Sequence, residues 1–289
     1  MVLNFRELLG PVIYPKDVRS LARPEEVLDV SIIGSYAPET PPLKPTDKIA
    51  CIGSCFAQEL AKSLAAKGRE VLPIFISERW NTAFALRHFL EFAMDGTPIP
   101  AAVVPNGVKT DEVITSAGAL RDADAFILTF GLSVCWFENA TGQMVLDVPE
   151  GHSTSGLRNA FKTHSMRQTT VEENIAQIDA AISSIRGQKP DAPIVVTLSP
   201  IPLLISMTDY PVVTSNTISK AVLRAALHMI HARYMDNVYY WPSYDIVEYM
   251  AKYHGPIFGQ GEDDLRHIKP ALINQIMELF DVCYFPQGA

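Results

Sequence analysis

Two short segments of the chain contain the residue types that nucleophilic acyl transfer requires. In CIGSCFAQEL, Gly53 and Ser54 lie between a short apolar run and apolar residues at helical spacing. A serine between a strand and a helix places its hydroxyl beside the free N–H groups of the helix N-terminus, which together with the helix dipole stabilise an oxyanion. The same place suits a helix N-cap, a role that serine often fills. Ser54 is therefore a candidate nucleophile, and a plain N-cap is the alternative.

The second segment, GEDDLRHIKP, offers the base that a serine hydroxyl needs. Asp264 precedes His267 by three residues, so its carboxylate can hold one imidazole nitrogen in a tight turn and leave the other free to accept a proton. A surface turn before a helix explains the same pattern. His228 and His231 have a spacing that suits a metal, but no third ligand lies near them in the sequence. No metal site is predicted.

Apolar runs of strand length alternate with segments of helical periodicity along most of the chain. Such uninterrupted runs are typical of sheets covered on both faces, and the alternation predicts an α/β fold with a mostly parallel sheet. In these folds sites form at the carboxyl ends of strands, so Ser54 and the Asp264–His267 pair can reach the same edge. The predicted strands cover residues 48–53, 70–75, 125–136, 143–148, 192–200 and 237–243. The predicted helices cover about 55–67, 82–94, 171–185, 215–234 and 270–280.

The predicted organisation is one large domain over residues 48–289 with an arm before it. Residues 1–47 are rich in proline and lack periodicity, so we expect an irregular arm packed on the domain. Residues 97–120 are polar and contain glycine, and we expect a loop or a small insertion there. A further loop is expected over residues 150–168.

Composition narrows the classes of function. The 289 residues carry a net charge of −8 and no cluster of Lys and Arg, which disfavours nucleic-acid binding. No signal peptide and no run of 18 uncharged apolar residues is found, and the four cysteines follow neither a disulfide nor a zinc pattern. We therefore expect a cytoplasmic protein without a membrane span. No nucleotide-binding fingerprint occurs, and no cofactor is predicted.

The segment IGSCFAQEL resembles the motif after which the GSCFA family is called. Later segments resemble that family in the same order, so the resemblance runs from about residue 45 to 282. These segments are LTFGLSVCWFE, VTLSPIPL, SNTISKAVLRAA and NVYYWPSYDIV. The family is similar to the SGNH and GDSL esterase-like superfamily, so the resemblance implies a flavodoxin-like three-layer α/β/α sandwich.

The resemblance also implies roles for single residues. Ser54 corresponds to the nucleophile, whose own N–H would donate to the oxyanion, and Asp264 and His267 correspond to the last-block pair. The superfamily's third block, Gly-x-Asn-Asp, is matched best at Gly131, where Ser133 replaces the asparagine and the aspartate is missing. The resemblance implies that N–H groups near Gly131 bind the oxyanion and that Ser133 stands where the side-chain donor is expected. Asn81, expected to cap the second helix, could supply the missing donor, and a plain N-cap is its alternative.

Three further residues have open roles. Asn216 and Lys220 match the family segment after TLSP, and Lys220 could hold an anionic group of a substrate. Asn216 could also be only a cap. Cys55 follows the candidate nucleophile and is its rival, because a thiol at a helix N-terminus can have a lowered pKa.

Two functions follow from these features. The first is a serine-dependent esterase, deacylase or O-acyltransferase acting on an acylated carbohydrate, because the resembled family is associated with extracellular polysaccharide biosynthesis. The second is a non-catalytic domain that binds a carbohydrate or a partner on a degenerate fold, since the third-block asparagine is replaced. The acyl group, the acceptor and the oligomeric state stay open.

Overall fold

The computed structural model describes residues 14, 27–75, 80–104, 108–146, 148, 153–234, 236–261 and 264–287. Its centre is a five-stranded parallel sheet in the order β2-β1-β3-β7-β8. The strands are β1 (Lys48–Gly53), β2 (Glu70–Val71), β3 (Ala125–Phe130), β7 (Ile194–Leu198) and β8 (Val238–Trp241). In the register, Gly53 pairs with Thr129 and Thr129 with Thr197, so the carboxyl ends of the central strands lie level at one edge.

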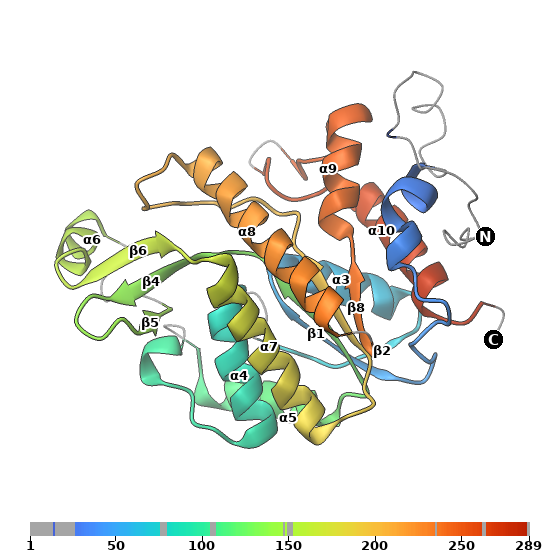
Figure 1. Cartoon of the computed structure of the whole chain (residues 1–289), viewed down its shortest axis with the longest axis horizontal. Coiled ribbons are helices and arrows are strands. Elements are labelled where there is room, and N and C mark those ends of the chain that lie inside the picture. The colour runs from blue at the N-terminus through green and yellow to red at the C-terminus, as the bar shows by residue number, and fades with distance from the viewer. Residues whose placement is uncertain are drawn as a thin grey trace.

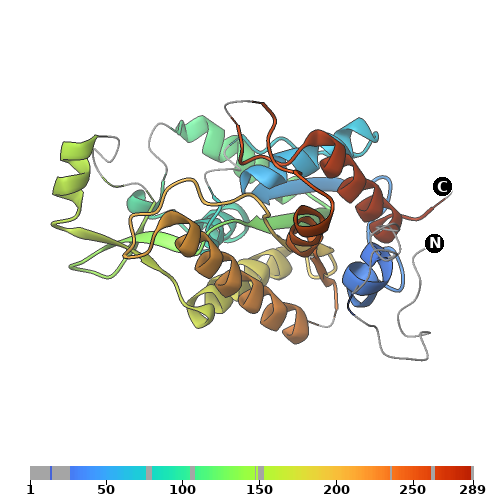
Figure 2. The ribbon, with the colours of Figure 1, turned by 90° about the horizontal axis from the view of Figure 1, so that it is seen from above.

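Helices cover both faces of this sheet, which makes the molecule a three-layer α/β/α sandwich (Figures 1 and 2). Successive strand residues alternate between two cores, with Ala50 and Ile52 in one and Ile49 and Cys51 in the other. The first core takes in α4 (Ala83–Asp95), α5 (Thr110–Asp122), α7 (Val171–Gln188) and α8 (Val212–Arg233). The second takes in α3 (Cys55–Ala66), α9 (Ser243–Tyr253) and α10 (Pro270–Tyr284). The predicted fold class is confirmed.

A small antiparallel sheet projects from the carboxyl edge of the main sheet, on the left in Figure 1. It consists of β5 (Met144–Val145), β4 (Val134–Glu138) and β6 (His164–Gln168), with α6 (Thr154–Ala160) before β6. The apolar run predicted as one strand over 125–136 is therefore divided between two sheets. The loop expected over 150–168 is wrong, because β6 is a largely polar strand that pairs with β4 and has no apolar pattern to reveal it.

The remaining differences lie in segments of weak periodicity. Residues 97–120 were expected to form a loop or a small insertion. They are not a plain loop, since η5 (Ala101–Val103) lies there and α5 begins at Thr110. The α5 helix buries only a narrow stripe that includes small and polar residues, so its pattern is faint. The helix α9 was not predicted at all, and α8 begins three residues before the expected Ser215.

The described part of the N-terminal arm packs against the second core. After Val27 it forms the short helical segments η2 (Leu28–Ile33) and η3 (Gly34–Tyr36), where an irregular segment was expected. Leu43 is buried there too, and its N–H donates to the carbonyl of Tyr284. Residues 1–26, apart from position 14, lie outside the described residues. In the part of the chain that is described, none of the helices combines the length and the apolar composition needed to cross a membrane.

Candidate active site

Ser54 lies at the joint between β1 and α3 and is almost completely buried. Its Oγ accepts the N–H of Phe56 at 3.2 Å, so Ser54 is the N-cap of α3. The same Oγ lies 3.1 Å from the Thr129 hydroxyl. The Ser54 N–H points to β3, where it donates to the Thr129 carbonyl at 3.1 Å and to its Oγ1 at 2.9 Å. The cap interpretation is thus confirmed, and it does not conflict with a nucleophile at this position.

Gly53 makes the joint possible. Its φ of +127° is a conformation that side chains of L-residues rarely adopt. A Cβ at this position would lie 1.9 Å from the Thr129 carbonyl oxygen. Only glycine therefore allows β1 to approach β3 this closely while the chain turns into α3.

A cavity of about 230 Å³ opens above this joint at the carboxyl edge of the sheet. Ser54 and Cys55 line it, and Ser54 and Asn81 lie close to Gly131. The segment that follows β7 lines it too, together with Arg266. The lining residues are Ser54, Cys55, Asn81, Gly131, Leu132, Ser199, Ile201, Pro202, Leu203, Leu204, Ile205 and Arg266.

Asp264 and His267 are brought together as a pair. Asp264 Oδ2 lies 2.8 Å from His267 Nδ1, and its Oδ1 accepts the backbone N–H groups of Arg266 and His267, both at 3.1 Å. The backbone N–H of His267, its ring and the N–H of Arg266 hold the pKa of the Asp264 carboxyl below its usual range. About a third of each side chain is exposed, so the pair stands in a solvent-facing turn.

The cavity and this pair are linked through Arg266 rather than through His267. The guanidinium of Arg266 donates from Nε and Nη2 to the Pro202 carbonyl, at 3.3 and 2.9 Å, and it lines the cavity. His267 is the next residue along the chain but does not line it. Among the described residues no hydrogen bond joins Ser54 to His267.

The backbone donors expected for an oxyanion are already occupied. The N–H groups of Gly131 and Leu132 donate to the Asn81 carbonyl at 2.8 and 3.1 Å, and the Ser54 N–H donates to Thr129. Asn81 is not the cap of α4, because Thr82 Oγ1 accepts the N–H of Ala85 in that role. The Asn81 side chain lines the cavity instead, and none of the described residues forms a hydrogen bond with it. Its amide is the donor best placed to meet a ligand.

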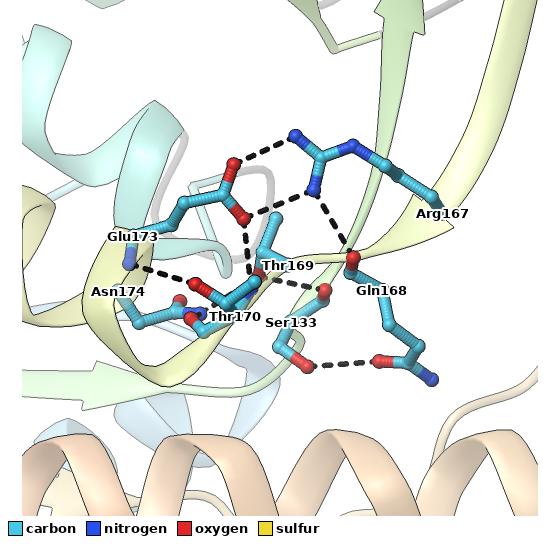
Figure 3. Close-up of polar contacts among 7 residues, drawn as sticks. All are labelled: Ser133, Arg167, Gln168, Thr169, Thr170, Glu173 and Asn174. Carbon is cyan, nitrogen blue, oxygen red and sulfur yellow. Dashed lines mark hydrogen bonds and ion pairs between the residues drawn. The ribbon is translucent and has the colours of Figure 1, made fainter.

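Ser133, expected to stand in for the missing asparagine, does not face the cavity. It immediately precedes β4, and Figure 3 shows its hydroxyl bonded to Gln168, to whose Oε1 it donates at 3.0 Å. Its carbonyl accepts two bonds from Thr169, and its N–H donates to the Ser219 hydroxyl. The close-up also shows the bidentate ion pair of Arg167 with Glu173, which links β6 to the first turn of α7. Ser133 therefore ties the small sheet to α8.

Lys220 holds the protein's own backbone rather than a substrate anion. It is only 1 % exposed, and its Nζ donates to the carbonyls of Gly131, Ser199 and Ile201 at 3.0, 2.7 and 2.8 Å. These three bonds use every proton of the ammonium group. Burial lowers the pKa of Lys220 to about 7. Lys220 lies on the same buried face of α8 as Leu223 and Leu227, which come three and seven residues later. A lysine at a position of the apolar pattern indicates a buried side chain, so the sequence contained a signal for this role.

Asn216 has a related function. It lies inside α8 and is not its cap, and its Oδ1 accepts the N–H of Leu203 at 2.9 Å. Asn216 and Lys220 therefore position the segment 199–203 that forms one wall of the cavity.

Cys55 is the one cysteine that lines the cavity. It is the first residue of α3 and is only partly buried. Burial raises the pKa of Cys51, Cys135 and Cys283 to about 12, which keeps these thiols protonated. Among the described residues no three His, Cys, Asp or Glu side chains gather as metal ligands.

Comparisons with known proteins show the family of the chain and a likeness to a solved structure. The model of the GSCFA family matches residues 107–280, which is more than half of the chain; Gly53 and Ser54 precede this range. No curated protein matches. Among solved structures, a salicylyl-acyltransferase from a tetracycline biosynthetic pathway matches with 16 % identity and a TM-score of 0.36. The match covers 80 % of this chain and 52 % of the acyltransferase, so this chain spans about half the length of the acyltransferase.

Proposed function

Since this chain belongs to the GSCFA family, we propose that its fold is of the SGNH type and that it is a serine-dependent esterase, deacylase or O-acyltransferase. The observation that carries the proposal is the cavity at the carboxyl edge of the sheet. Ser54, at the N-terminus of α3, and Arg266 both line it, and Arg266 is followed in the chain by a His267 that Asp264 orients. This arrangement supports Ser54 as the nucleophile, His267 as the base and Asp264 as the orienting carboxylate.

In the proposed mechanism, Ser54 Oγ attacks the ester carbonyl and its proton passes to Nε2 of His267. Asp264 holds the Nδ1–H and stabilises the imidazolium that forms. The oxyanion develops at the N-terminus of α3, within reach of the Asn81 amide. Collapse expels the alcohol, which takes its proton from His267, and leaves the acyl group on Ser54. Water or a sugar hydroxyl, deprotonated by His267, then removes the acyl group.

This mechanism requires two adjustments of the site. The Ser54 hydroxyl has to turn from Thr129 and the Phe56 N–H towards the cavity, a rotation about one side-chain bond. His267, in its solvent-facing turn, has to approach Ser54. Hydrogen bonds of catalytic groups are often long in ligand-free enzymes and tighten only with substrate bound.

The substrate class in this proposal is an acylated carbohydrate or polysaccharide precursor, which rests on the family resemblance. A reducing, cytoplasmic location is also part of the proposal. The buried Cys51, Cys135 and Cys283 support it, since they form no disulfide within the described part of the chain.

The decisive experiment uses a fluorophosphonate probe and short aryl esters. The wild-type protein is expected to be labelled and to hydrolyse the ester, and Ser54→Ala is expected to lose both. Ser63→Ala, a change on the same helix α3, is the matched control and should keep both. Cys55→Ala should also keep labelling and turnover. Activity that survives in Ser54→Ala and vanishes in Cys55→Ala would assign the nucleophile to the thiol.

A second candidate function is a non-catalytic domain that binds a carbohydrate or partner. The observation that favours it is the occupied backbone donors: the N–H groups of Ser54 and Gly131 are already bonded to Thr129 and Asn81. Under this function the folded protein should neither react with the probe nor turn over aryl or acetylated-sugar esters. Calorimetric titration with acetylated oligosaccharides should still detect binding.

A further inference from the structure

The cavity at the carboxyl edge is lined by polar and by apolar residues. Ser54, Asn81 and Arg266 belong to its polar lining. Its apolar lining includes the segment Ile-Pro-Leu-Leu-Ile over residues 201–205, five apolar residues in succession, all of which line the cavity. Leu132 lines the cavity as well. An ester whose acyl part is apolar and whose alcohol part is polar matches this composition.

The apolar lining includes side chains that water reaches. Leu204 is 61 % exposed and Ile205 is 56 % exposed. Single exposed aliphatic side chains are ordinary on protein surfaces. Leu204 and Ile205, however, are adjacent and line a cavity that also contains a candidate nucleophile. An apolar group of a ligand that packs against them would displace water from both.

The backbone that presents these side chains is held at several points. Lys220 binds the carbonyls of Ser199 and Ile201, and Asn216 accepts the N–H of Leu203. Arg266 donates to the Pro202 carbonyl from the opposite side. A lining fixed in this way does not need to be ordered by the ligand, so contact with an apolar chain costs little conformational entropy.

On the premise of the acyl-transfer function, we propose that the acyl group is an aliphatic chain longer than acetyl, which lies along Leu204 and Ile205. A volume of 230 Å³ holds about seven or eight groups of the size of a water molecule, each of which occupies about 30 Å³ in the liquid. The cavity therefore takes a chain of roughly four to eight carbons. Each buried methylene is expected to raise kcat/KM about fourfold until the chain fills the cavity.

The experiment measures kcat/KM for p-nitrophenyl acetate, butyrate, hexanoate and octanoate. The wild type should show a steep rise with chain length. The double variant Leu204→Ser/Ile205→Ser should show a much flatter one, and both substitutions are on exposed side chains that the fold tolerates. Val213→Ser is the matched control, because Val213 is 75 % exposed on α8 and does not line the cavity; its chain-length series should equal that of the wild type.

Binding to the Ser54→Ala protein separates this inference from the proposed function. Calorimetric titration with hexanoate and acetate should show the longer acid binding at least tenfold more tightly, and the Leu204→Ser/Ile205→Ser change should remove the difference. Equal binding of the two acids, or Ser54-dependent turnover that is flat across the ester series, would overturn the apolar subsite. The latter result would leave the acyl-transfer function standing. Preferential binding of hexanoate without any turnover would support the subsite and contradict the enzyme.

Discussion

The two edges of the parallel sheet each bear a cavity, and the larger one is at the edge without a candidate nucleophile. At the amino ends of the strands, a cavity of about 540 Å³ lies between the chain entering β1 and the turns before β3, β7 and β8. None of the described residues lining it is a serine, cysteine or histidine. At the carboxyl ends, the cavity of about 230 Å³ contains Ser54, Cys55 and Asn81.

The polar groups at the two edges also differ in what they bind. At the amino edge, Asp47 and Asp124 accept the backbone N–H groups of Lys44 and Lys48, and the first of these bonds is partly buried while the second is exposed. At the carboxyl edge, the buried ammonium of Lys220 joins α8 to two other chain segments, at Gly131 and at residues 199–201. Under the proposed function, the volume of a cavity is a poor guide to the active site. The meeting of strand ends, with a side chain that fixes the loops after them, is a better guide.

Gly53→Ala should have the largest effect on this arrangement. The new Cβ would meet the Thr129 carbonyl at 1.9 Å in a conformation that alanine disfavours, so β1 and β3 must separate. We expect a loss of about 4 kcal/mol in the free energy of unfolding, measured by urea denaturation. Gly118→Ala is the control, because a Cβ there meets nothing within 4 Å and the residue lies in α5, so a gain of up to about 1 kcal/mol is expected. Equal stability of Gly53→Ala and wild type would contradict the close approach.

Lys220→Met tests the support of the carboxyl edge. The variant keeps an unbranched side chain one atom shorter but leaves the carbonyls of Gly131, Ser199 and Ile201 without their donor. We expect a loss of about 3 kcal/mol in the free energy of unfolding. Lys62→Met, at an exposed position of α3, should change it by less than about 0.5 kcal/mol. Similar effects of the two substitutions would mean that the three carbonyl bonds contribute little.

Asp264→Asn tests the solvent-facing half of the site. The amide can still accept the N–H groups of Arg266 and His267, so the turn should stay folded, but it cannot stabilise a positive charge on the imidazole. We expect kcat to fall about a hundredfold with KM nearly constant, because the interaction acts only when His267 takes up the proton. Asp236→Asn is the control, since that carboxylate is 78 % exposed and lies at the amino edge. A rise in KM at constant kcat would assign Asp264 to substrate binding.

The contribution of Lys220 should also depend on pH. Burial lowers its pKa to about 7 in the folded protein, while in the unfolded chain the pKa is about 10.4. Between these values the unfolded state binds more protons, so stability rises with pH, by up to about 1.4 kcal/mol per pH unit. The difference in unfolding free energy between wild type and Lys220→Met should therefore grow from pH 7 to pH 10. A constant or shrinking difference would show that the three carbonyls keep Lys220 fully charged.

The sequence predicted the strands of the main sheet and most of its helices, because buried parallel strands and amphipathic helices have strong patterns. It missed β6, whose residues are polar on both faces, and α5, whose buried stripe is narrow. At the site, local spacing was enough to predict the pairing of Asp264 with His267.

The other site residues depend on contacts distant in sequence. The acceptors of Lys220 lie 19 to 89 residues away, and the partner of the Gly131 N–H is Asn81 on another segment. Such partners are set by how strand ends meet in space, which periodicity along one segment does not encode.

The smallest effect is expected at the amino edge. Lys189→Ala with Asp191→Asn changes two residues that line the larger cavity, and neither forms part of the sheet or of the Lys220 contacts. Surface substitutions away from a site rarely alter stability by more than about 0.5 kcal/mol, so this variant should stay folded. If chemistry is confined to the carboxyl edge, its kcat/KM for an aryl ester should therefore change by less than about twofold.

The same measurement on Asn81→Ala, at the other edge, should show a loss of about a hundredfold if its amide donates to the oxyanion. A large loss in the amino-edge variant would break the comparison, because it would mean that the larger cavity takes part in the reaction after all.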